Sequence, residues 1–284
     1  MEEADFRGLE ITIVGLGLIG GSYASALRKM NPKKLWAIDI ERDILDQAEN
    51  RGIIDGGYIE GASVLKRSDL VIISVYPELT VRFIQENLDY FKPGSVLTDA
   101  AGIKKKVIDD IRKFIRKDLD FVGGHPLAGK ECSGFANASS DIFMGANYIV
   151  TPVPENKRSS LLLVEKMIRG IGCREPILMN PEEHDQVIAL TSQLPHLIAA
   201  ALINSSEFEN IGSLIGGSFK DATRVAKMNV TLWSELLLEN KENILTQIKV
   251  FADNITRFQN ALQKEDSTSL AELLEKANRG REKL

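Results

Sequence analysis

Short runs of aliphatic and β-branched residues alternate with amphipathic stretches through the first half of the chain. Such alternation predicts an α/β fold with a doubly wound, mostly parallel sheet. Ligands of these sheets bind beyond the carboxyl ends of the strands, so Tyr76, Pro77 and Gly102, which follow two of the runs, are candidate ligand contacts. The predicted strands are 11–14, 35–38, 70–75, 95–98, 120–122 and 148–150.

The pattern changes near Pro152. From there the strand signals nearly disappear, apart from one short candidate strand near 176–179. At 284 residues the chain exceeds the usual size of a single domain. We therefore predict a sheet domain over residues 1–153 and an all-helical domain over residues 154–284.

Two shorter helices are predicted in the second half by their caps. Asn180 can cap a helix that has Pro181 in its first turn, and this helix should continue past His196. Pro195 should kink it, because proline removes a backbone donor and crowds the preceding turn. A last helix is expected to begin at Ser269, which forms a capping box with the glutamate three residues later.

The longest predicted helix starts near Thr231 and carries one apolar seam. The seam repeats every seven residues over about four heptads, which is typical of a coiled-coil contact. An ordinary core could produce the same stripe, but its length favours a helical dimer interface, with Asn240 as a register-setting polar residue. The seam consists of Trp233, Leu237, Asn240, Ile244, Ile248, Phe251, Ile255, Phe258 and Leu262.

A glycine-rich turn directly follows the first predicted strand. Gly15 would permit the tight turn, Gly17 would let backbone amides approach a pyrophosphate, and Gly20 would let the next helix pack on the strand. Leu18 and Ile19 complete the pattern between the last two glycines. The turn therefore indicates a phosphate-binding loop at a helix N-terminus.

Asp39 ends the second predicted strand, at the offset where such folds place an acid against the adenosine ribose. Strand, turn, helix, strand and acid in this order predict a dinucleotide clamp of the Rossmann type, and Tyr76, Pro77 and Gly102 become candidate cofactor contacts. A carboxylate repels a ribose 2′-phosphate, so NAD is expected rather than NADP. Arg42 keeps NADP open, because an arginine there could bind that phosphate.

The composition disfavours several other classes of protein. A formal net charge of −5 argues against nucleic-acid binding. The acidic N-terminus lacks the pattern of a signal peptide, and no apolar run is expected to reach the roughly 20 residues needed to cross a bilayer. The 2 cysteines suggest neither a disulfide framework nor a metal site. We expect a cytoplasmic protein without metal, membrane or nucleic-acid partners.

His125 is the leading candidate for chemistry among the 3 histidines. It follows an apolar strand and two glycines, so it should lie at the ligand edge of the sheet. A histidine with a pKa near neutrality can accept a proton from an alcohol while a hydride leaves the same carbon. The alternative is a loop histidine that only bonds the backbone. His184, followed by Asp185, is interpreted as structural.

His196 lies on the predicted kinked helix, and Ser192 is one turn earlier on the same face. This pair could border a pocket, or the histidine could be buried at the kink. Arg224 follows a glycine turn that leads into a helix. An arginine is suited to bidentate binding of a carboxylate, although an exposed salt bridge is an equally good interpretation.

Taken together, these motifs resemble the prephenate dehydrogenase family, which includes arogenate and cyclohexadienyl dehydrogenases. The resemblance covers nearly the whole chain, and the order of the motifs makes it specific. The motifs are the Gly-Leu-Ile-Gly-Gly-Ser turn at 17–22, Gly124-His125-Pro126-Leu127-Ala128-Gly129 with Glu131, His184-Asp185, Ser192 to His196, and Phe219 to Arg224 followed by Trp233.

The resemblance implies an N-terminal Rossmann domain that binds NAD and a C-terminal helical dimerisation domain. It also implies that His125 is the catalytic base, which takes the proton of the ring 4-hydroxyl. His196 and Arg224 would bind substrate, with the arginine on a substrate carboxylate. Ser192 and Glu131 match pocket positions of the family.

Two positions depart from the family pattern. The family commonly has a serine at the position of Gly102, so a hydroxyl that would orient His125 is absent here. The family usually has threonine where Lys130 stands, and an extra cation near the pocket could change which substrate side chain is preferred.

The activity implied by the resemblance is oxidative decarboxylation of prephenate by NAD on the tyrosine pathway. Hydride removal with proton transfer to His125 would give a dienone that loses carbon dioxide and becomes 4-hydroxyphenylpyruvate. Arogenate dehydrogenase, a β-hydroxyacid or imine reductase, and a redox-sensing dimer without activity are the alternatives. His125 argues against the reductases, which carry their catalytic group on the interdomain helix.

Overall fold

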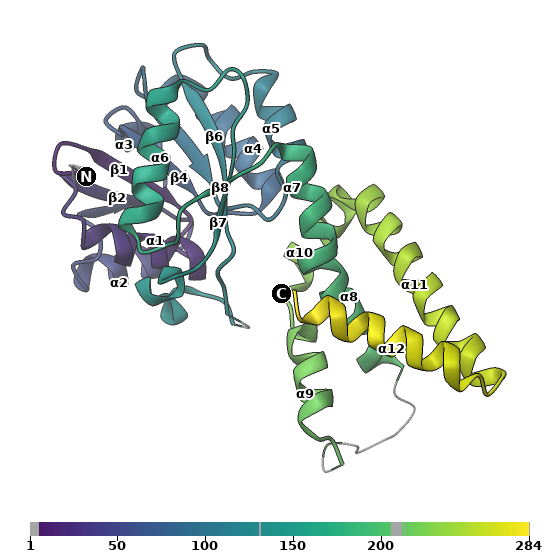
Figure 1. The fold of residues 1–284 in the computed structure, drawn as a ribbon. Helices are drawn as coiled ribbons and strands as arrows, with labels where there is room; N and C mark the ends of the chain where they lie inside the picture. The colour runs from purple at the N-terminus through teal and green to yellow at the C-terminus, as the bar shows by residue number, and fades with distance from the viewer. Residues whose placement is uncertain (1–5, 131, 206–211, 213, 284) are drawn as a thin grey trace.

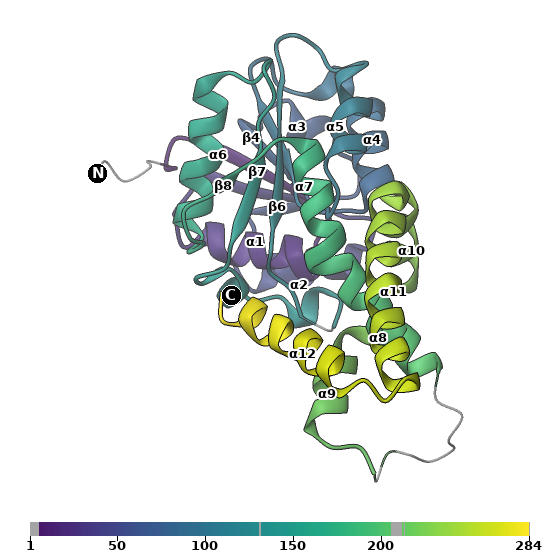
Figure 2. The same cartoon turned by 45° about the vertical axis from the view of Figure 1, so that its right-hand side comes forward.

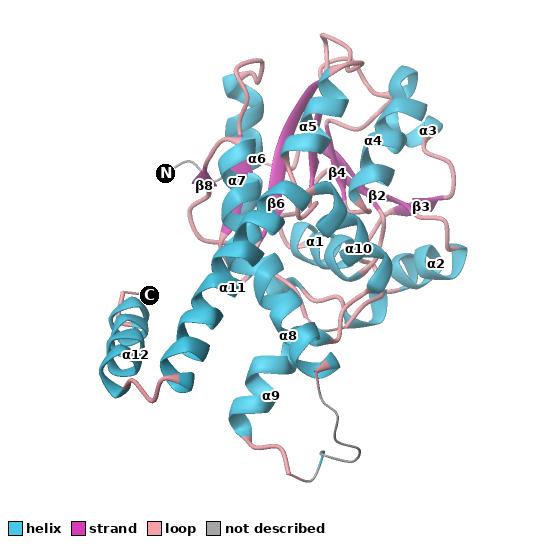
Figure 3. Ribbon diagram, turned by 90° about the vertical axis from the view of Figure 1, so that its right-hand side faces the viewer, coloured by secondary structure: helices cyan, strands magenta, loops and turns pink. Residues whose placement is uncertain are grey.

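The chain forms a sheet unit followed by a helical unit (Figure 1). The computed structural model describes residues 6–130, 132–205, 212 and 214–283. Helices lie on both sides of the sheet (Figure 3). The predicted doubly wound, mostly parallel sheet followed by a helical region is confirmed.

The described residues form an eight-stranded sheet in the order β3-β2-β1-β4-β5-β6-β7-β8. The pair β6–β7 is antiparallel, and the other neighbours pair in parallel. The order reverses between β1 and β4, where such sheets open a crevice for a ligand. The strands are β1 (Glu10–Val14), β2 (Lys34–Ile38), β3 (Gly56–Tyr58), β4 (Leu70–Ile73), β5 (Val96–Asp99), β6 (Asp120–Pro126), β7 (Tyr148–Thr151) and β8 (Ile177–Leu178).

Each predicted strand is present, and two short strands extend the sheet at its edges. The sequence pattern does not predict β3, because two of its three residues are glycines without the side chains typical of a strand. β8 falls on the short candidate strand near 176–179. Its pairing with β7 extends the sheet past the predicted boundary between residues 153 and 154.

Alternating strand residues supply two separate apolar cores. In β4, Leu70 and Ile72 join the core on one face, whereas Val71 and Ile73 join the core on the other. Both faces are buried, which explains why the strands read as nearly continuous apolar runs. The helices of this unit are α1 (Leu18–Arg28), α2 (Arg42–Asn50), α3 (Ala62–Leu65), α4 (Pro77–Glu86), α5 (Lys105–Arg112) and α6 (Arg158–Gly170).

The helical unit begins with a long helix that contains a wide turn. α7 (Pro181–Ile188) continues through the π-helical turn Ala189–Gln193 into α8 (Leu194–Asn204). The predicted kink at Pro195 thus takes the form of a π turn. Thr191, whose carbonyl the proline ring would crowd in a regular helix, lies inside this turn.

The predicted continuous helix from Thr231 to Leu262 is wrong at Asn240. α10 (Val230–Glu239) ends there and α11 (Lys241–Gln263) begins, because Asn240 has φ −110° and ψ 21°. Its buried side chain donates to the carbonyl of Asp185 at 2.8 Å and to Oε1 of Gln193 at 2.7 Å. Asn240 is therefore a buried hinge and not the register-setting residue of a coiled coil.

The remaining helices complete the second unit. α9 (Gly217–Thr223) leads into a 3₁₀ turn, Arg224–Ala226, which packs against α8. α12 (Ser267–Arg281) runs back from the far end of α11 (Figure 1). Its cap is Asp266, which accepts the amide of Ser269 at 3.0 Å, so the predicted start at Ser269 is two residues too late.

The segment Pro181–Asn204 is long and apolar enough to cross a membrane by length and composition, with a mean hydropathy of 1.5 over an 18-residue window. The expectation that no apolar run reaches this length is wrong. The same helix contacts α5 and α11, which lie in the two different units (Figure 2).

The hinge at Asn240 yields a stability prediction. Asn240→Ala removes a donor from two buried oxygens, so the free energy of unfolding should fall by about 1–3 kcal/mol. Asn254→Ala is the control, since that side chain donates to the carbonyl of Val250 in its own helix. Urea unfolding of both variants measures the difference, and equal midpoints would show that the hinge contacts contribute nothing.

Candidate active site

The glycine turn lies at the carboxyl edge of the sheet, between β1 and α1. Gly15 has a positive φ of 83°, and a Cβ built on Gly20 would lie 1.8 Å from the carbonyl oxygen of Gly15. These two positions therefore require glycine for the turn and for close packing. A Cβ built on Gly17 would contact nothing within 4 Å, so the turn is open where α1 begins at Leu18 and Ile19.

Ser74 follows β4 beside the same turn. Its Oγ is buried without a hydrogen-bond partner among the described residues. A Cβ built on Gly20 would lie 3.1 Å from the Cβ of Ser74. An unpaired buried hydroxyl beside an open glycine turn fits a site that a polar ligand completes.

Asp39 lies at the end of β2 and bonds to the glycine turn. Its Oδ2 accepts the amide of Leu16 at 2.6 Å, and its Oδ1 accepts the amide of Glu41 at 2.9 Å. The next residue, Ile40, is 84% exposed, and its apolar side chain offers no donor to a phosphate. Arg42 points to β3, where it donates to the carbonyl of Gly57 at 3.4 Å.

Tyr76 and Pro77 begin α4 at the same edge. The hydroxyl of Tyr76 accepts from the side-chain Nδ2 of Asn229 at 2.9 Å, directly before α10. The backbone amide of Glu78 donates to Oε1 of Glu235 at 2.6 Å. α10 is thus held against the ligand edge of the sheet.

His125 lies in β6, and a second histidine holds its ring. Its Nδ1 is 2.9 Å from Nε2 of His184, and Nδ1 of His184 is 2.7 Å from Oδ1 of Asp185. The side chain of His184 is fully buried at the start of α7. The burial of His184 and its bond to Asp185 agree with the structural interpretation, and the contact with His125 is what the sequence did not predict. The one sequence signal for this contact was that His184-Asp185 is among the motifs that resemble the prephenate dehydrogenase family.

A buried ion pair supports the strand ends behind His125. Lys104 and Asp99 are both inaccessible to solvent and their side chains are bonded. Asp99 also accepts the amides of Ala101 at 3.1 Å and Gly124 at 3.0 Å. Full pairing of the two charges fixes the ends of β5 and β6.

Burial lowers the pKa of His125 well below its usual value, and the neighbouring His184 and Lys104 lower it further. Burial also lowers the pKa of His184. The expectation that His125 titrates near neutrality is corrected accordingly. The imidazole of His125 is neutral at pH 7 and can accept a proton.

Gly102 lies against the second ring nitrogen of His125. A Cβ built on Gly102 would be 3.9 Å from Nε2 of His125 and 3.3 Å from Cδ2 of Leu236. Leu236 comes from α10, so the helical unit covers the position where the family commonly has serine. Nε2 therefore faces the region between the two units.

His196 stacks on Trp233, with ring centroids 3.8 Å apart. Its Nδ1 is 2.8 Å from the carbonyl of Ser192, so this nitrogen carries the proton that it donates. Trp233 and Leu236 are one turn apart on the same face of α10. α10 therefore connects the two groups of candidates. Its Trp233 stacks on His196, and its Leu236 lies against Gly102 beside His125.

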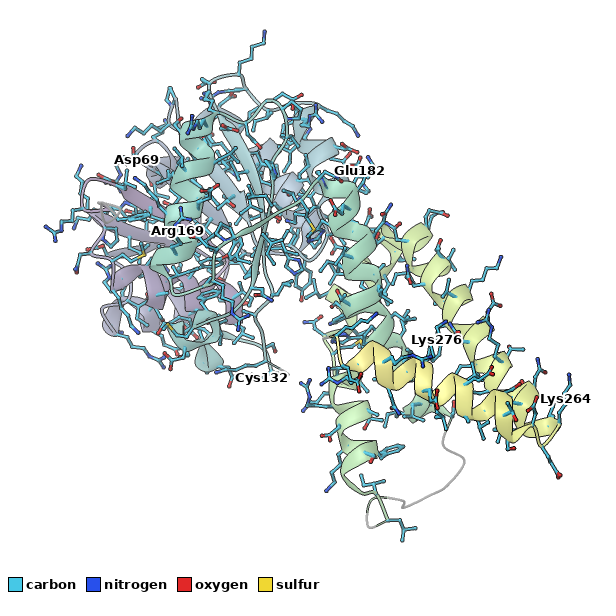
Figure 4. The ribbon with its side chains drawn as sticks, viewed as in Figure 1. Asp69, Cys132, Arg169, Glu182, Lys264 and Lys276 are labelled. Carbon is cyan, nitrogen blue, oxygen red and sulfur yellow. The ribbon has the colours of Figure 1, made fainter. Side chains whose placement is uncertain are left out.

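Other candidate residues differ in their surroundings. Arg224 is exposed in the 3₁₀ turn beside α8. Glu131 lies outside the described residues. Lys130 is exposed, and its Nζ lies 3.4 Å from the carbonyl of Asn137. Cys132 lies on the side of the sheet unit that faces the helical unit (Figure 4).

A phosphate-binding turn, an acid at the ribose position and a neutral imidazole at one sheet edge are typical of a dinucleotide-dependent dehydrogenase. Comparison with known proteins makes this more specific. Residues 23–175 match the family model of the prephenate dehydrogenase nucleotide-binding domain, and residues 180–276 match that of the prephenate dehydrogenase dimerization domain. The chain belongs to the prephenate dehydrogenase family, as its motifs predicted.

Individual relatives agree with this assignment. The chain is 33% identical to a prephenate dehydrogenase of Bacillus subtilis over 92% of its own length and 72% of the relative. The structure of Aquifex aeolicus prephenate dehydrogenase with hydroxyphenyl propionate and NAD+ superposes with a TM-score of 0.89 at 31% identity, covering 97% of this chain and 98% of that one. An arogenate dehydrogenase of Synechocystis gives a TM-score of 0.83 at 25% identity, over 97% and 99%.

Proposed function

We propose that this chain oxidises prephenate with NAD and releases carbon dioxide and 4-hydroxyphenylpyruvate. The observation that carries this proposal is the half-buried His125, whose pKa is lowered, at the nucleotide edge of a sheet in a chain of this family. Family membership disfavours the reductase and the redox-sensor alternatives. Arogenate, which has an amino group where prephenate has a keto group, is the alternative substrate.

The described residues fit NAD. The glycine turn is open at Gly17, the hydroxyl of Ser74 has no partner in the described part of the chain, and the carboxylate of Asp39 can accept from ribose hydroxyls. When bound, NAD accepts the hydride from C4 of the substrate ring. The main task of the protein is then to position the substrate and to remove one proton.

His125 performs the proton transfer in this proposal. Its Nε2 accepts the proton of the 4-hydroxyl while the hydride leaves the same carbon. The resulting dienone loses its carboxylate as carbon dioxide, because the ring becomes aromatic. Arg224 and His196 bind the substrate, with the guanidinium on a carboxylate.

The assay that tests the proposal supplies the purified protein with prephenate or arogenate and with NAD or NADP. Formation of NADH and 4-hydroxyphenylpyruvate from prephenate supports it. A higher kcat/KM with arogenate would identify the alternative substrate. Absence of turnover with both substrates would contradict the proposed activity.

Asp39 should determine the choice of cofactor. Asp39→Ser removes a ribose acceptor and a source of repulsion. The kcat/KM with NAD should therefore fall, and the ratio of kcat/KM with NADP to kcat/KM with NAD should rise. Arg42→Ala is the control and should leave the ratio unchanged, since Arg42 points to β3. Steady-state kinetics with both cofactors measure the ratio, and an unaltered ratio in Asp39→Ser would refute this role.

His125→Asn should lower kcat by a factor of about 10²–10⁴, the usual contribution of a general base. Because activity needs the neutral imidazole, the wild-type kcat/KM should rise with pH on an acid limb below the usual histidine range. The variant should lose that limb. Near-normal kcat with the wild-type pH profile would make His125 a structural residue of β6.

Arg224→Ala provides the matched contrast to the base variant. Loss of a charge-assisted carboxylate contact should raise KM for prephenate roughly tenfold to a hundredfold. KM for NAD and the acid limb of the pH profile should stay close to wild type. This combination separates an anchor from a base.

A homodimer is also part of the proposal. On α11, Leu245, Ile248, Ile255 and Leu262 share one face and are 39–62% exposed. α12, which the structure describes in full, has no buried residue. These faces lie in the part that matches the dimerization domain, so a second copy would cover them.

The dimer contact can be tested on α11. Ile248→Glu with Phe251→Glu places charges in the exposed seam and should give monomers or an unfolded helical unit. Lys249→Glu, on a neighbouring face, should leave the dimer intact. Light scattering at micromolar concentration measures the mass, and a monomeric wild type would contradict the proposal.

We further propose a cytoplasmic enzyme that binds neither membrane nor nucleic acid. Within one chain, 28% of the apolar 18-residue window in Pro181–Asn204 is buried. A dimer would cover the apolar surface that remains exposed. The net charge of −5 supports the absence of a nucleic-acid partner.

A further inference from the structure

We propose that Asp185 and His184 form a positioning relay that fixes the tautomer of His125, so that its Nε2 is the basic atom. The inference rests on the proposed role of His125. The three groups form one chain of hydrogen bonds, with 2.7 Å between Asp185 and His184 and 2.9 Å between the histidines. The relay is separated from the substrate side by the ring of His125.

The relay starts from a carboxylate whose acceptors are already in use. Oδ1 of Asp185 accepts the amide of Lys104 at 2.8 Å, and Oδ2 accepts the amide of Lys105 at 3.0 Å. These bonds hold the carboxylate at the start of α5. Because a carboxylate only accepts, Nδ1 of His184 must be the donor in their bond and must carry a proton.

The proton on His184 determines the proton on His125. Burial keeps His184 neutral, so its Nε2 carries a lone pair. Nδ1 of His125 must then donate to it. A neutral His125 with a proton on Nδ1 has its lone pair on Nε2, the nitrogen that faces Gly102 and the region between the units.

This arrangement makes a hydroxyl at position 102 unnecessary. A serine there could orient the ring from the Nε2 side. In this chain the ring is held from the Nδ1 side instead, and Gly102 leaves Nε2 free of a side-chain donor or acceptor at that position.

The relay also stabilises the charge that forms during the reaction. The proton of the substrate hydroxyl moves to Nε2 of His125, which becomes an imidazolium. Its Nδ1–H remains on the bond to His184, and the carboxylate of Asp185 stabilises the positive ring without taking a proton. The charged groups near the ring from the other elements are Lys104 and Asp99, which are paired with each other.

Ring-nitrogen NMR tests the tautomers directly. The chain has 3 histidines, so protein labelled with ¹⁵N-histidine gives few signals, and single His→Gln variants assign them. At neutral pH we expect Nδ1 protonated and Nε2 bare in both His125 and His184. Protonation of Nε2 in His125 would overturn the inference. A mixture of tautomers of His125 is expected in His184→Gln.

Kinetics test the consequence. His184→Gln and Asp185→Asn should lower kcat at least about tenfold, and by no more than the 10²–10⁴-fold lost with the base itself. KM for NAD should be unchanged. The acid limb of kcat/KM should move to lower pH in Asp185→Asn, because the negative charge that favours the imidazolium is removed.

Glu182→Gln is the control. It removes a negative charge from the same helix, and Glu182 pairs with Lys105 at the surface (Figure 4). This variant should keep wild-type kcat and pH profile. If Asp185→Asn fails to fold because backbone donors lose their acceptor, His184→Gln and the NMR spectra decide.

The outcomes separate the relay from the proposed function. If His125→Asn loses activity while His184→Gln keeps the wild-type kcat and pH limb, the relay is refuted and the base remains. If His125→Asn keeps activity, the proposed function of His125 fails, whatever the tautomers are.

Discussion

The position of one carboxylate, that of Asp185, determines how the two units meet. Its oxygens accept the amides of Lys104 and Lys105 in the sheet unit and the ring proton of His184. Its own carbonyl accepts the side chain of Asn240, at the junction of α10 and α11. One residue therefore connects the start of α5, the sheet edge that carries His125 and the junction of α10 and α11.

Such a junction is specific because buried polar groups must be paired. A carboxylate taken out of water is stabilised only where donors meet it with good geometry, whereas apolar surfaces can slide with little cost. The buried ion pair Asp99–Lys104 acts in the same way at the end of β5, the strand next to β6. The orientation of α7 against the sheet is thus set by hydrogen bonds, and apolar packing fills the space around them.

The sequence predicts what depends on local pattern. The strands, the glycine turn and the places of Asp39 and His125 at one edge follow from periodicity and from the rule that ligands bind at the carboxyl ends of strands. The family, the dehydrogenase class and the two-part architecture follow from the order of the motifs.

The features that the sequence does not predict are contacts between residues far apart in the chain. His184 lies 59 residues after His125, so nothing local indicates that their rings meet. Apolar positions repeat with helical spacing on both sides of Asn240, so the pattern predicts a continuous helix. The bonds of Asn240 to its buried partners Asp185 and Gln193 explain why the helix ends there. The pKa of His125 depends on the same packing, because burial is its largest cause.

The π turn Ala189–Gln193 has a geometric effect on the two histidines of the long helix. Residues 184 and 196 are 12 positions apart, which in a regular α-helix would place them about 120° apart around the axis. A π turn accommodates one extra residue without extra rotation, which reduces the angle to about 20°. His184 and His196 therefore face the same side of one helix, and a wide turn acts as the phase correction that brings the histidine bonded to His125 and the histidine stacked on Trp233 onto a common wall.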